Sequence, residues 1–461
     1  MFRSKKKWLT GFLSMSCIGL LSAPAYSANW LMLQGTEPTD AAPRAKVWGF
    51  IQPEYQKTDD TKLKAGAFSG QKAVFNQIRP DLNTNESFNV LRARLGVRGI
   101  GLPLDSNVNY FLLAEFGNNG ITRNGGGSAK ITDASVTLNH IPGARIRVGQ
   151  FKHPGSEEGL QAIHVFDYIN FSNVVNQMIL ERFFDGDGST TAGNGTGVCA
   201  GGTANVACAN KPNGPVSAFR DVGVQVFNTF KSGDWEHSYA VMYGNGNGIA
   251  RGDNDDNKEV YLYWASEWVF GGKGPRREGM KLYAWSQDGK RTLTGATAAG
   301  GTGGAGEYDR ERSGVGLTFR KGSQRAAFEY ITADGMIFNG TDGGAVAGSA
   351  NNAGTGTASF NVATTGEADG WYLHYGWAFH PKWELDVRYD ILNRLTDNTN
   401  GERKFETWTL GMQYFFNKKT RLIANYEVRD AEAPNQASSA AANQILDSMD
   451  DRISLQLLAI F

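Results

Sequence analysis

The chain has 461 residues, with 46 basic and 46 acidic side chains, 58 glycines, 13 prolines and 3 cysteines. A balanced charge gives no indication of nucleic acid or another strongly charged partner, so we expect no nucleic-acid binding. Beyond the N-terminal region, no segment offers the roughly 18 consecutive apolar residues of a transmembrane helix. The composition excludes a helical membrane protein, but it allows a barrel whose strands point every second side chain into a wet lumen.

The N-terminal residues have the three parts of a secretory signal. Residues 3–7 hold four basic side chains, residues 9–21 are mostly apolar, and residues 23–28 are mainly small. We predict a signal peptide over residues 1–27, with cleavage after Ala25, Ser27 or Ala28 left open. The exported part, residues 28–461, would be an outer-membrane barrel. An N-terminal membrane anchor is the competing interpretation, which the shortness of the apolar stretch disfavours.

The exported part alternates apolar and polar side chains again and again, as β-strands do. At the C-terminus, for example, Ile453, Leu455 and Leu457 fall on one face, while Ser454 and Gln456 fall on the other. The pattern predicts sixteen strands, with strand boundaries from residue 44 to residue 461. Their ranges are 44–56, 88–100, 106–117, 130–140, 144–152, 219–230, 234–245, 257–271, 278–288, 308–321, 324–334, 368–380, 382–393, 403–416, 419–430 and 450–461.

The predicted connections alternate between tight turns and long loops. The short ones are 141–143, 231–233, 321–323, 380–381 and 417–418; the long ones are 57–87, 118–129, 153–218, 289–307, 335–367 and 431–449. Short turns at one end and long loops at the other are typical of outer-membrane barrels. We therefore predict an all-β fold, a transmembrane antiparallel β-barrel of sixteen strands. A large soluble β-sandwich or propeller would also alternate, but it would not need an apolar outer face on every strand.

The longest connection, 153–218, contains a segment too apolar for a solvent-exposed loop. Long loops with structure of their own tend to be functional. We predict that this third long loop folds into the lumen as a constriction loop; an extra strand and a partner-binding tip are the alternatives. Its distal part holds Cys199 and Cys208, which we expect to form a disulfide, because two cysteines in an exported chain usually pair. Cys17 would leave with the signal.

Several segments resemble the phosphate-selective porin O and P family. The resemblance covers about residues 88–185 and rests on the runs at 91–99, 114–117, 131–138, 147–152 and 178–182. It implies a sixteen-stranded, anion-conducting porin of the outer membrane that assembles as a homotrimer. Outer-membrane lipid and small anions such as phosphate would be its partners.

Strand alternation also indicates which charged side chains face the lumen. If Leu95 and Val148 face lipid, basic side chains on the same two strands point inward. The predicted anion-binding set is Arg92, Arg94, Arg98, Arg145 and Arg147, with Lys152 and Arg182 beside the constriction. By the same rule Arg220 faces outward or lies at a rim. Arginine suits phosphate because its planar fork donates two hydrogen bonds to two oxygens.

Carboxylates point inward by the same rule and favour a different interpretation. They are Glu115, Asp133, Glu329, Glu384, Asp386, Asp390 and Glu427. An acidic wall at 384–390, opposite the arginines, would give a general, weakly selective porin. A structural barrel that anchors a partner is a third alternative. We find no catalytic constellation, no metal-ligand spacing and no cofactor motif, so the sequence predicts passive, anion-preferring diffusion and not an enzyme.

Overall fold

The computed structural model describes most of residues 28–461. The described residues are 27–32, 43–66, 69–70, 73–76, 78, 84–101, 104–119, 129–181, 217–249, 252–253, 255–272, 276–293, 306–338 and 362–461. Most of the predicted signal, the side chain of Arg182 and the predicted pair Cys199 and Cys208 lie outside these residues.

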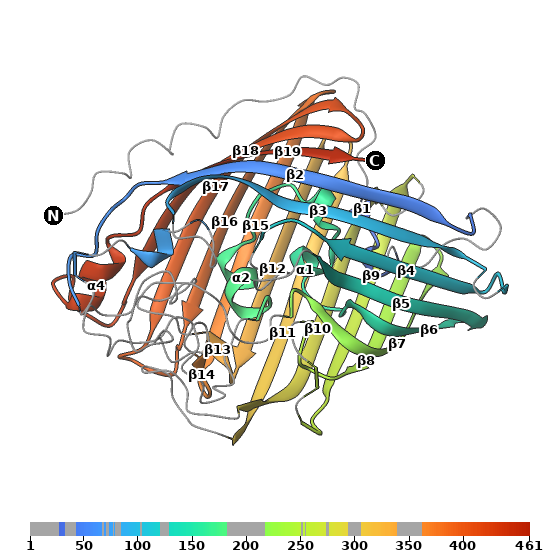
Figure 1. The fold of residues 1–461 in the computed structure, drawn as a ribbon, viewed down its shortest axis with the longest axis horizontal. Helices are drawn as coiled ribbons and strands as arrows, with labels where there is room; N and C mark the ends of the chain where they lie inside the picture. Colours follow the sequence, from blue (N-terminus) through green and yellow to red (C-terminus); the bar gives the residue numbers. More distant parts are fainter. Residues whose placement is uncertain are drawn as a thin grey trace.

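The main sheet closes on itself as an antiparallel barrel (Figure 1). It has seventeen strands, of which the two-residue β1 (Ser27–Ala28) pairs with β10; the other sixteen form a ring that the β9–β10 pairing closes. The strands of the ring are β2 (Lys46–Thr58), β3 (Glu86–Ile100), β4 (Val108–Glu115), β5 (Lys130–Ile141), β6 (Ala144–Lys152), β7 (Arg220–Ser232), β8 (Trp235–Gly244), β9 (Glu259–Gly271), β10 (Arg276–Leu293), β11 (Gly306–Lys321), β12 (Gln324–Asp334), β15 (Glu367–His380), β16 (Trp383–Arg394), β17 (Arg403–Asn417), β18 (Thr420–Glu432) and β19 (Arg452–Ile460).

The remaining elements are short. The helices are α1 (Glu157–Leu160), α2 (Asn173–Met178) and α4 (Ala441–Leu446), the 3-10 turns are η2 (Trp30–Met32), η3 (Val74–Asn76) and η4 (Ile163–Val165), and β13 (Ile337–Phe338) pairs with β14 (Val362–Ala363). Across the described residues, none of the helices has the length and apolar character needed to cross a membrane.

Each of the sixteen predicted ranges overlaps one strand of the ring, which confirms the predicted fold. The largest difference is β10, which continues to Leu293, five residues past the predicted end at 288. Its last residues pair in regular register with the start of β11, so that Arg291 lies opposite Tyr308. The extension is polar and therefore lacks the apolar alternation that marked the rest of the strand.

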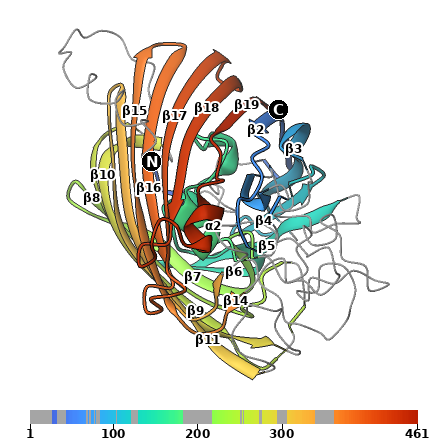
Figure 2. The ribbon, with the colours of Figure 1, turned by 90° about the vertical axis from the view of Figure 1, so that its left-hand side faces the viewer.

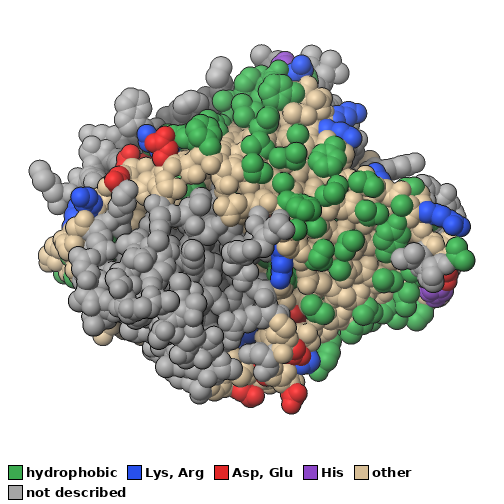
Figure 3. All heavy atoms as spheres, in the orientation of Figure 1, with side chains coloured by type: hydrophobic (Ala, Val, Ile, Leu, Met, Phe, Trp, Pro, Cys, Tyr) green, Lys and Arg blue, Asp and Glu red, His purple; other side chains and the backbone are tan. Residues whose placement is uncertain are grey.

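The outer surface of the barrel is apolar, because alternate side chains of each strand point away from the lumen. On β19, Ile453, Leu455 and Leu457 are 46%, 41% and 39% exposed, while Ser454 and Gln456 between them are buried. Hydrophobic side chains of this kind spread over the barrel wall in Figure 3. Such a surface fits the hydrocarbon core of a bilayer, and the closed ring leaves no unpaired strand edge there.

The buried hydrophobic core lies inside the barrel and not between layers. Residues 153–181, which follow β6, include α1, η4 and α2, and α2 contacts β15, β16 and β17 (Figures 1 and 2). Val174, Val175 and Ile179 from this segment are fully buried, and they belong to one cluster with wall residues such as Tyr283 and Trp285. The apolar character of the segment is therefore explained by packing against the inner wall.

The tight turn between β7 and β8 forms where its glycine predicted it. Gly233 lies between β7 and β8 with φ +63°, a left-handed conformation that glycine adopts without steric cost. The last strand returns to the first, since the N–H of Phe461 donates to the carbonyl oxygen of Gly49 at 3.0 Å.

Candidate functional site

One side of the inner wall carries buried basic side chains on β3 and β6. Arg92, Arg94 and Arg147 are 4%, 6% and 2% exposed, and Arg98 and Arg145 are half-buried. Their inward direction follows from the pleat, because Leu95 and Val148 on the same strands are exposed on the outer face. The five predicted arginines thus lie on neighbouring parts of one wall.

Most of the partners that fix these arginines are neutral. Arg92 donates to the amide oxygen of Gln52 at 3.3 Å, and Arg145 donates to that of Asn228 at 3.4 Å. Arg147 donates to the Thr137 hydroxyl at 3.3 Å, and its guanidinium carbon lies 4.4 Å from the ring centroid of Phe227. Neutral partners orient a guanidinium without cancelling its charge, so this wall keeps a positive potential.

Arg94 has an acidic partner within the wall. Its Nε donates to Oε2 of Glu115 at 2.7 Å, and both side chains are almost completely buried. Glu115 also accepts from the backbone N–H groups of Ala93 and Gly117. Part of the basic charge is therefore balanced by a carboxylate that also fixes the backbone of β3 and β4.

Arg220, the first residue of β7, is buried against Asp133, so of the two predicted positions, outward or at a rim, the outward one is wrong. It is 3% exposed and holds both carboxylate oxygens of Asp133, with contacts between 3.0 and 3.1 Å. Phe219, just before it, has φ +65°, and Gly149 on the paired strand has φ +126°. The β6–β7 register is regular as far as Arg220, which is the first residue of β7, so this position is a strand end, where alternation is a poor guide to side-chain direction.

Lys152, at the end of β6, fixes the start of residues 153–181, which are called the lumen segment below. Its buried ammonium donates to the carbonyl oxygens of Gly159 and Gln161 at 2.7 and 2.6 Å. Among the described carboxylates, none lies within ion-pair distance of it. Lys152 therefore joins the end of β6 to the start of this segment.

The lumen segment continues from the basic wall to the opposite wall and binds it through its polar groups. The Ser156 hydroxyl donates to Glu329 at 2.9 Å, and the backbone N–H of Asn173 donates to Asp390 at 2.8 Å. Glu158 pairs with Arg388 at 3.0 Å. These contacts come from β12 and β16, so the segment spans the lumen from one side to the other.

The opposite wall is less acidic than the sequence analysis predicted. Glu384, Asp386 and Asp390 do point inward, but two buried arginines lie among them. Arg325 contacts Glu384 at 2.7 Å and Asp386 at 2.6 Å, and Arg388 lies 3.5 Å from Asp390. These arginines share the parity of the carboxylates, and they offset part of the negative charge.

One group on this wall has a metal-like composition. Asp167, His374 and Asp386 each bring a ligand atom within 4.8 Å of the others. The guanidinium of Arg325 contacts Asp167 at 3.1 Å and Asp386 at 2.6 Å. A cation of the protein already pairs with both carboxylates, so we assign no metal to this group.

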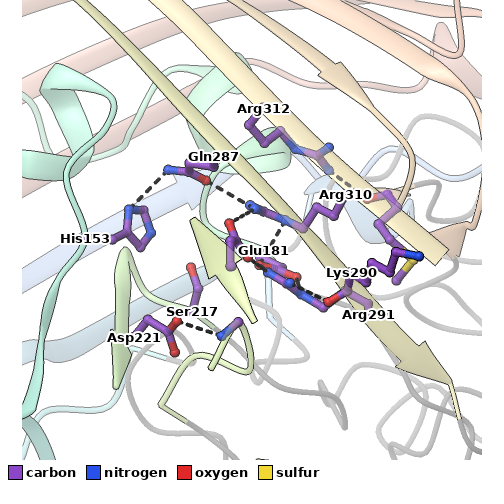
Figure 4. Close-up of polar contacts among 12 residues, drawn as sticks. His153, Glu181, Ser217, Asp221, Gln287, Lys290, Arg291, Arg310 and Arg312 are labelled. Carbon is purple, nitrogen blue, oxygen red and sulfur yellow. Dashed lines mark hydrogen bonds and ion pairs between the residues drawn. The ribbon is translucent and has the colours of Figure 1, made fainter. Parts of the chain in front are cut away.

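The described part of the lumen segment ends in a buried charge cluster (Figure 4). Glu181 bridges two arginines, with 2.8 Å to Nη2 of Arg291 and 3.1 Å to Nε of Arg310. Glu259 of β9 contacts the same two arginines at 2.6 and 2.7 Å. Burial alone would raise the pKa of Glu181, but Arg291 and Arg310 hold it below its ordinary value. The carboxylate therefore stays ionised and ties the segment to β10 and β11.

The sequence analysis missed these two arginines for different reasons. Arg291 was placed in a loop, because the predicted strand ended too early. Arg310 has the inward parity of its strand, opposite to the exposed Val315, so alternation was sufficient to find it. Their carboxylate partner on the lumen segment could not be predicted, because it lies more than a hundred residues away in the sequence.

The segment around η2 also lies in the lumen. Trp30 and Leu31 are 7% and 3% exposed within the same core cluster as Leu160. The amide of Asn29 donates to Glu236 at 3.1 Å. Trp30 borders two cavities, one of about 80 Å³ toward β11, β12 and β15 and one of about 230 Å³ toward β2–β4. It therefore separates two compartments of the lumen.

We expect Trp30→Ala to enlarge the open pore. Replacing a buried Trp by Ala costs about 3–5 kcal/mol of packing, whereas β1 is tied to β10 by two residue pairs only. Residues 29–32 should then leave the lumen, and single-channel conductance should rise. Trp264→Ala, on the outer face, is the matched control; equal conductance for both variants would contradict a lumen position for Trp30.

The geometry defines a class of protein before any comparison. A closed sixteen-stranded barrel with an apolar outer face, a charged lumen and a segment across that lumen has the architecture of a porin. Salmonella typhi OmpF in complex with daunomycin matches 90% of this chain and 97% of its own, with 12% identity and a TM-score of 0.52. A loop L8 deletion mutant of OmpT, an outer membrane protein of Vibrio cholerae, matches 92% and 100%, with 10% identity and a TM-score of 0.50. At these identities the matches show the fold alone.

The family model gives the finer assignment. Residues 347–456 match the model described as phosphate-selective porin O and P. The resemblance predicted from residues 88–185 is thus to the same family, and the match lies on a different part of the chain. No curated protein matches the sequence. Fold and family together make the chain an outer-membrane channel.

Proposed function

We propose that this channel gives small solutes passive passage across the outer membrane and prefers anions, phosphate or related oxyanions in particular. The observation that carries the proposal is the wall of β3 and β6, called the basic wall, where five arginines point inward and Arg92 and Arg145 donate to neutral side chains. Rings or ladders of arginine favour anions in pores. Fields inside a narrow lumen are less screened than in bulk solution, so local charge matters more than the balanced total.

Two features support the lumen segment as the constriction. It spans from Lys152 to Glu181, and polar contacts fix it to the walls at both ends and in the middle. Its apolar residues pack on the inner wall. A segment fixed in this way narrows the lumen beside the basic wall, where solutes would pass the arginines. Arg182 would follow directly after Glu181.

The alternative of a general, weakly selective porin rests on the buried carboxylates. Glu115 and Asp133 each neutralise one arginine of the basic wall. If such pairs dominate, the arginines brace the wall and the pore distinguishes ions poorly. A structural barrel that anchors a partner would pass little current.

The family resemblance implies that the protein assembles as a homotrimer in outer-membrane lipid. The N-terminal pattern predicts that residues 1–27 are removed first.

The test is a reversal potential measured across a planar bilayer under a potassium chloride gradient. We expect a reversal potential of the sign that indicates a preference for chloride. We also expect millimolar phosphate to reduce chloride current by occupying the basic wall. Preference for potassium would refute the anion proposal, absence of phosphate block would limit it to unspecific anions, and absence of current would favour the structural barrel.

A further inference from the structure

The larger of the two cavities that Trp30 borders combines positive charge with aromatic rings. It has a volume of about 230 Å³ and lies between the β2–β4 wall and η4 of the lumen segment. Arg94, Arg98, Lys152 and Arg220 line it, together with a single carboxylate, that of Asp133. Among the described lining residues, basic side chains thus outnumber carboxylates by four to one, and one of the four, Arg94, also pairs with Glu115. A bound anion would balance this excess.

The rest of the cavity lining is aromatic or aliphatic, and it includes His164, whose ring lies 5.7 Å from that of Trp48. Trp48, Phe50 and Phe111 form a cluster in which the ring of Trp48 lies 6.3 Å from Phe50 and 5.9 Å from Phe111. The arginines stack on these rings, with Arg98 5.5 Å from Trp48 and Arg94 5.7 Å from Phe50. Guanidinium groups and apolar surface thus alternate along one cavity wall.

An unused hydrogen-bond donor lies at the same wall. The indole Nε1 of Trp48 is buried and has no hydrogen-bond partner among the described residues. A buried donor without a partner costs free energy unless a ligand or water accepts from it. A carboxylate held by Arg98 would be one such acceptor, because Arg98 stacks on the same indole.

A small hydrated oxyanion would use the charges of this cavity but not its rings. Aromatic walls add affinity when the ligand itself buries apolar surface. We infer that the cavity is a subsite for organic carboxylates with an aromatic or bulky apolar body, which place the carboxylate at the arginines and the body against Trp48 and Phe111. The inference rests on the proposed anion channel and narrows its substrate class beyond inorganic oxyanions.

The experiment compares block of chloride current by sodium benzoate and by sodium acetate, added to the full-length protein in a planar bilayer. Both probes carry one carboxylate, and only benzoate carries a ring. We expect half-block by benzoate at about a tenfold lower concentration, which corresponds to about 1.4 kcal/mol. Trp48→Leu should remove this difference, and Trp48→Phe, which keeps a ring but loses the N–H, should reduce it.

Phe405→Leu is the matched control, because Phe405 is a buried lumen aromatic that also stacks on an arginine, 5.2 Å from Arg394, outside the cavity. It should keep the wild-type difference. The unblocked conductance of each variant shows that the barrel has formed. Equal block by benzoate and acetate in a chloride-preferring pore would overturn the subsite and leave the proposed function intact. A potassium-preferring pore would instead overturn the proposed function.

Discussion

Arg98→Glu is expected to reduce the chloride-over-potassium permeability ratio by about tenfold. A change of two charges about 6 Å from a passing ion is worth about 1.4 kcal/mol for each ion even at the dielectric constant of water, against chloride and in favour of potassium. Screening by salt reduces the combined effect on the ratio to about tenfold. Arg98 is the suitable position because it is half-buried and lines the larger cavity. A glutamate there keeps contact with water, so the barrel should tolerate the reversal.

The control for this prediction is the same charge change on the outer surface. Lys57→Glu reverses a side chain that is 48% exposed and pairs with Glu86 outside the lumen. It should leave the reversal potential unchanged. The measurement is the reversal potential at low and high salt, since a genuine charge effect weakens as ionic strength rises. If Arg98→Glu behaves like Lys57→Glu, the arginines brace the wall and the weakly selective porin is correct.

Alternation predicted the barrel well because each strand faces two solvents, lipid outside and water or packed loop inside. The same rule placed Arg92, Arg94 and Arg147 inward, and their burial agrees with that direction. It was a poor guide at Arg220, which is the first residue of β7 and lies at a strand end. Parity is reliable only as far as the backbone stays extended.

Alternation could not predict contacts between segments that are distant in the sequence. The position of Trp30 in the lumen depends on the packing of η2 against core residues that lie far from it in the sequence. Likewise, the pairing of Glu158 with Arg388 joins residues 230 positions apart. Local pattern identifies which residues face inward, but it does not say which of them meet.

The second large effect is expected at Glu181, where Glu181→Gln should release the end of the lumen segment. The substitution leaves Arg291 and Arg310 with Glu259 as their one remaining carboxylate in the described cluster. Breaking a buried ion pair from one side typically costs about 3–5 kcal/mol, because the remaining charges stay buried. The ladder hydrogen bonds of the barrel do not involve Glu181, so the loss should affect the segment and not the barrel.

A released segment leaves more open space in the lumen, and its movements should appear as fluctuations of the single-channel current. We therefore expect Glu181→Gln to raise single-channel conductance and the frequency of brief closures, while heat-resistant migration in gels is retained. Glu181→Asp, which keeps the charge, should show a smaller change, and Glu86→Gln, at an exposed position, should show none.

The charge also predicts the direction of selectivity: removing a lumen carboxylate between two arginines should strengthen chloride preference. Higher conductance together with weaker chloride preference would mean that the lumen segment, and not the wall arginines, selects the ion.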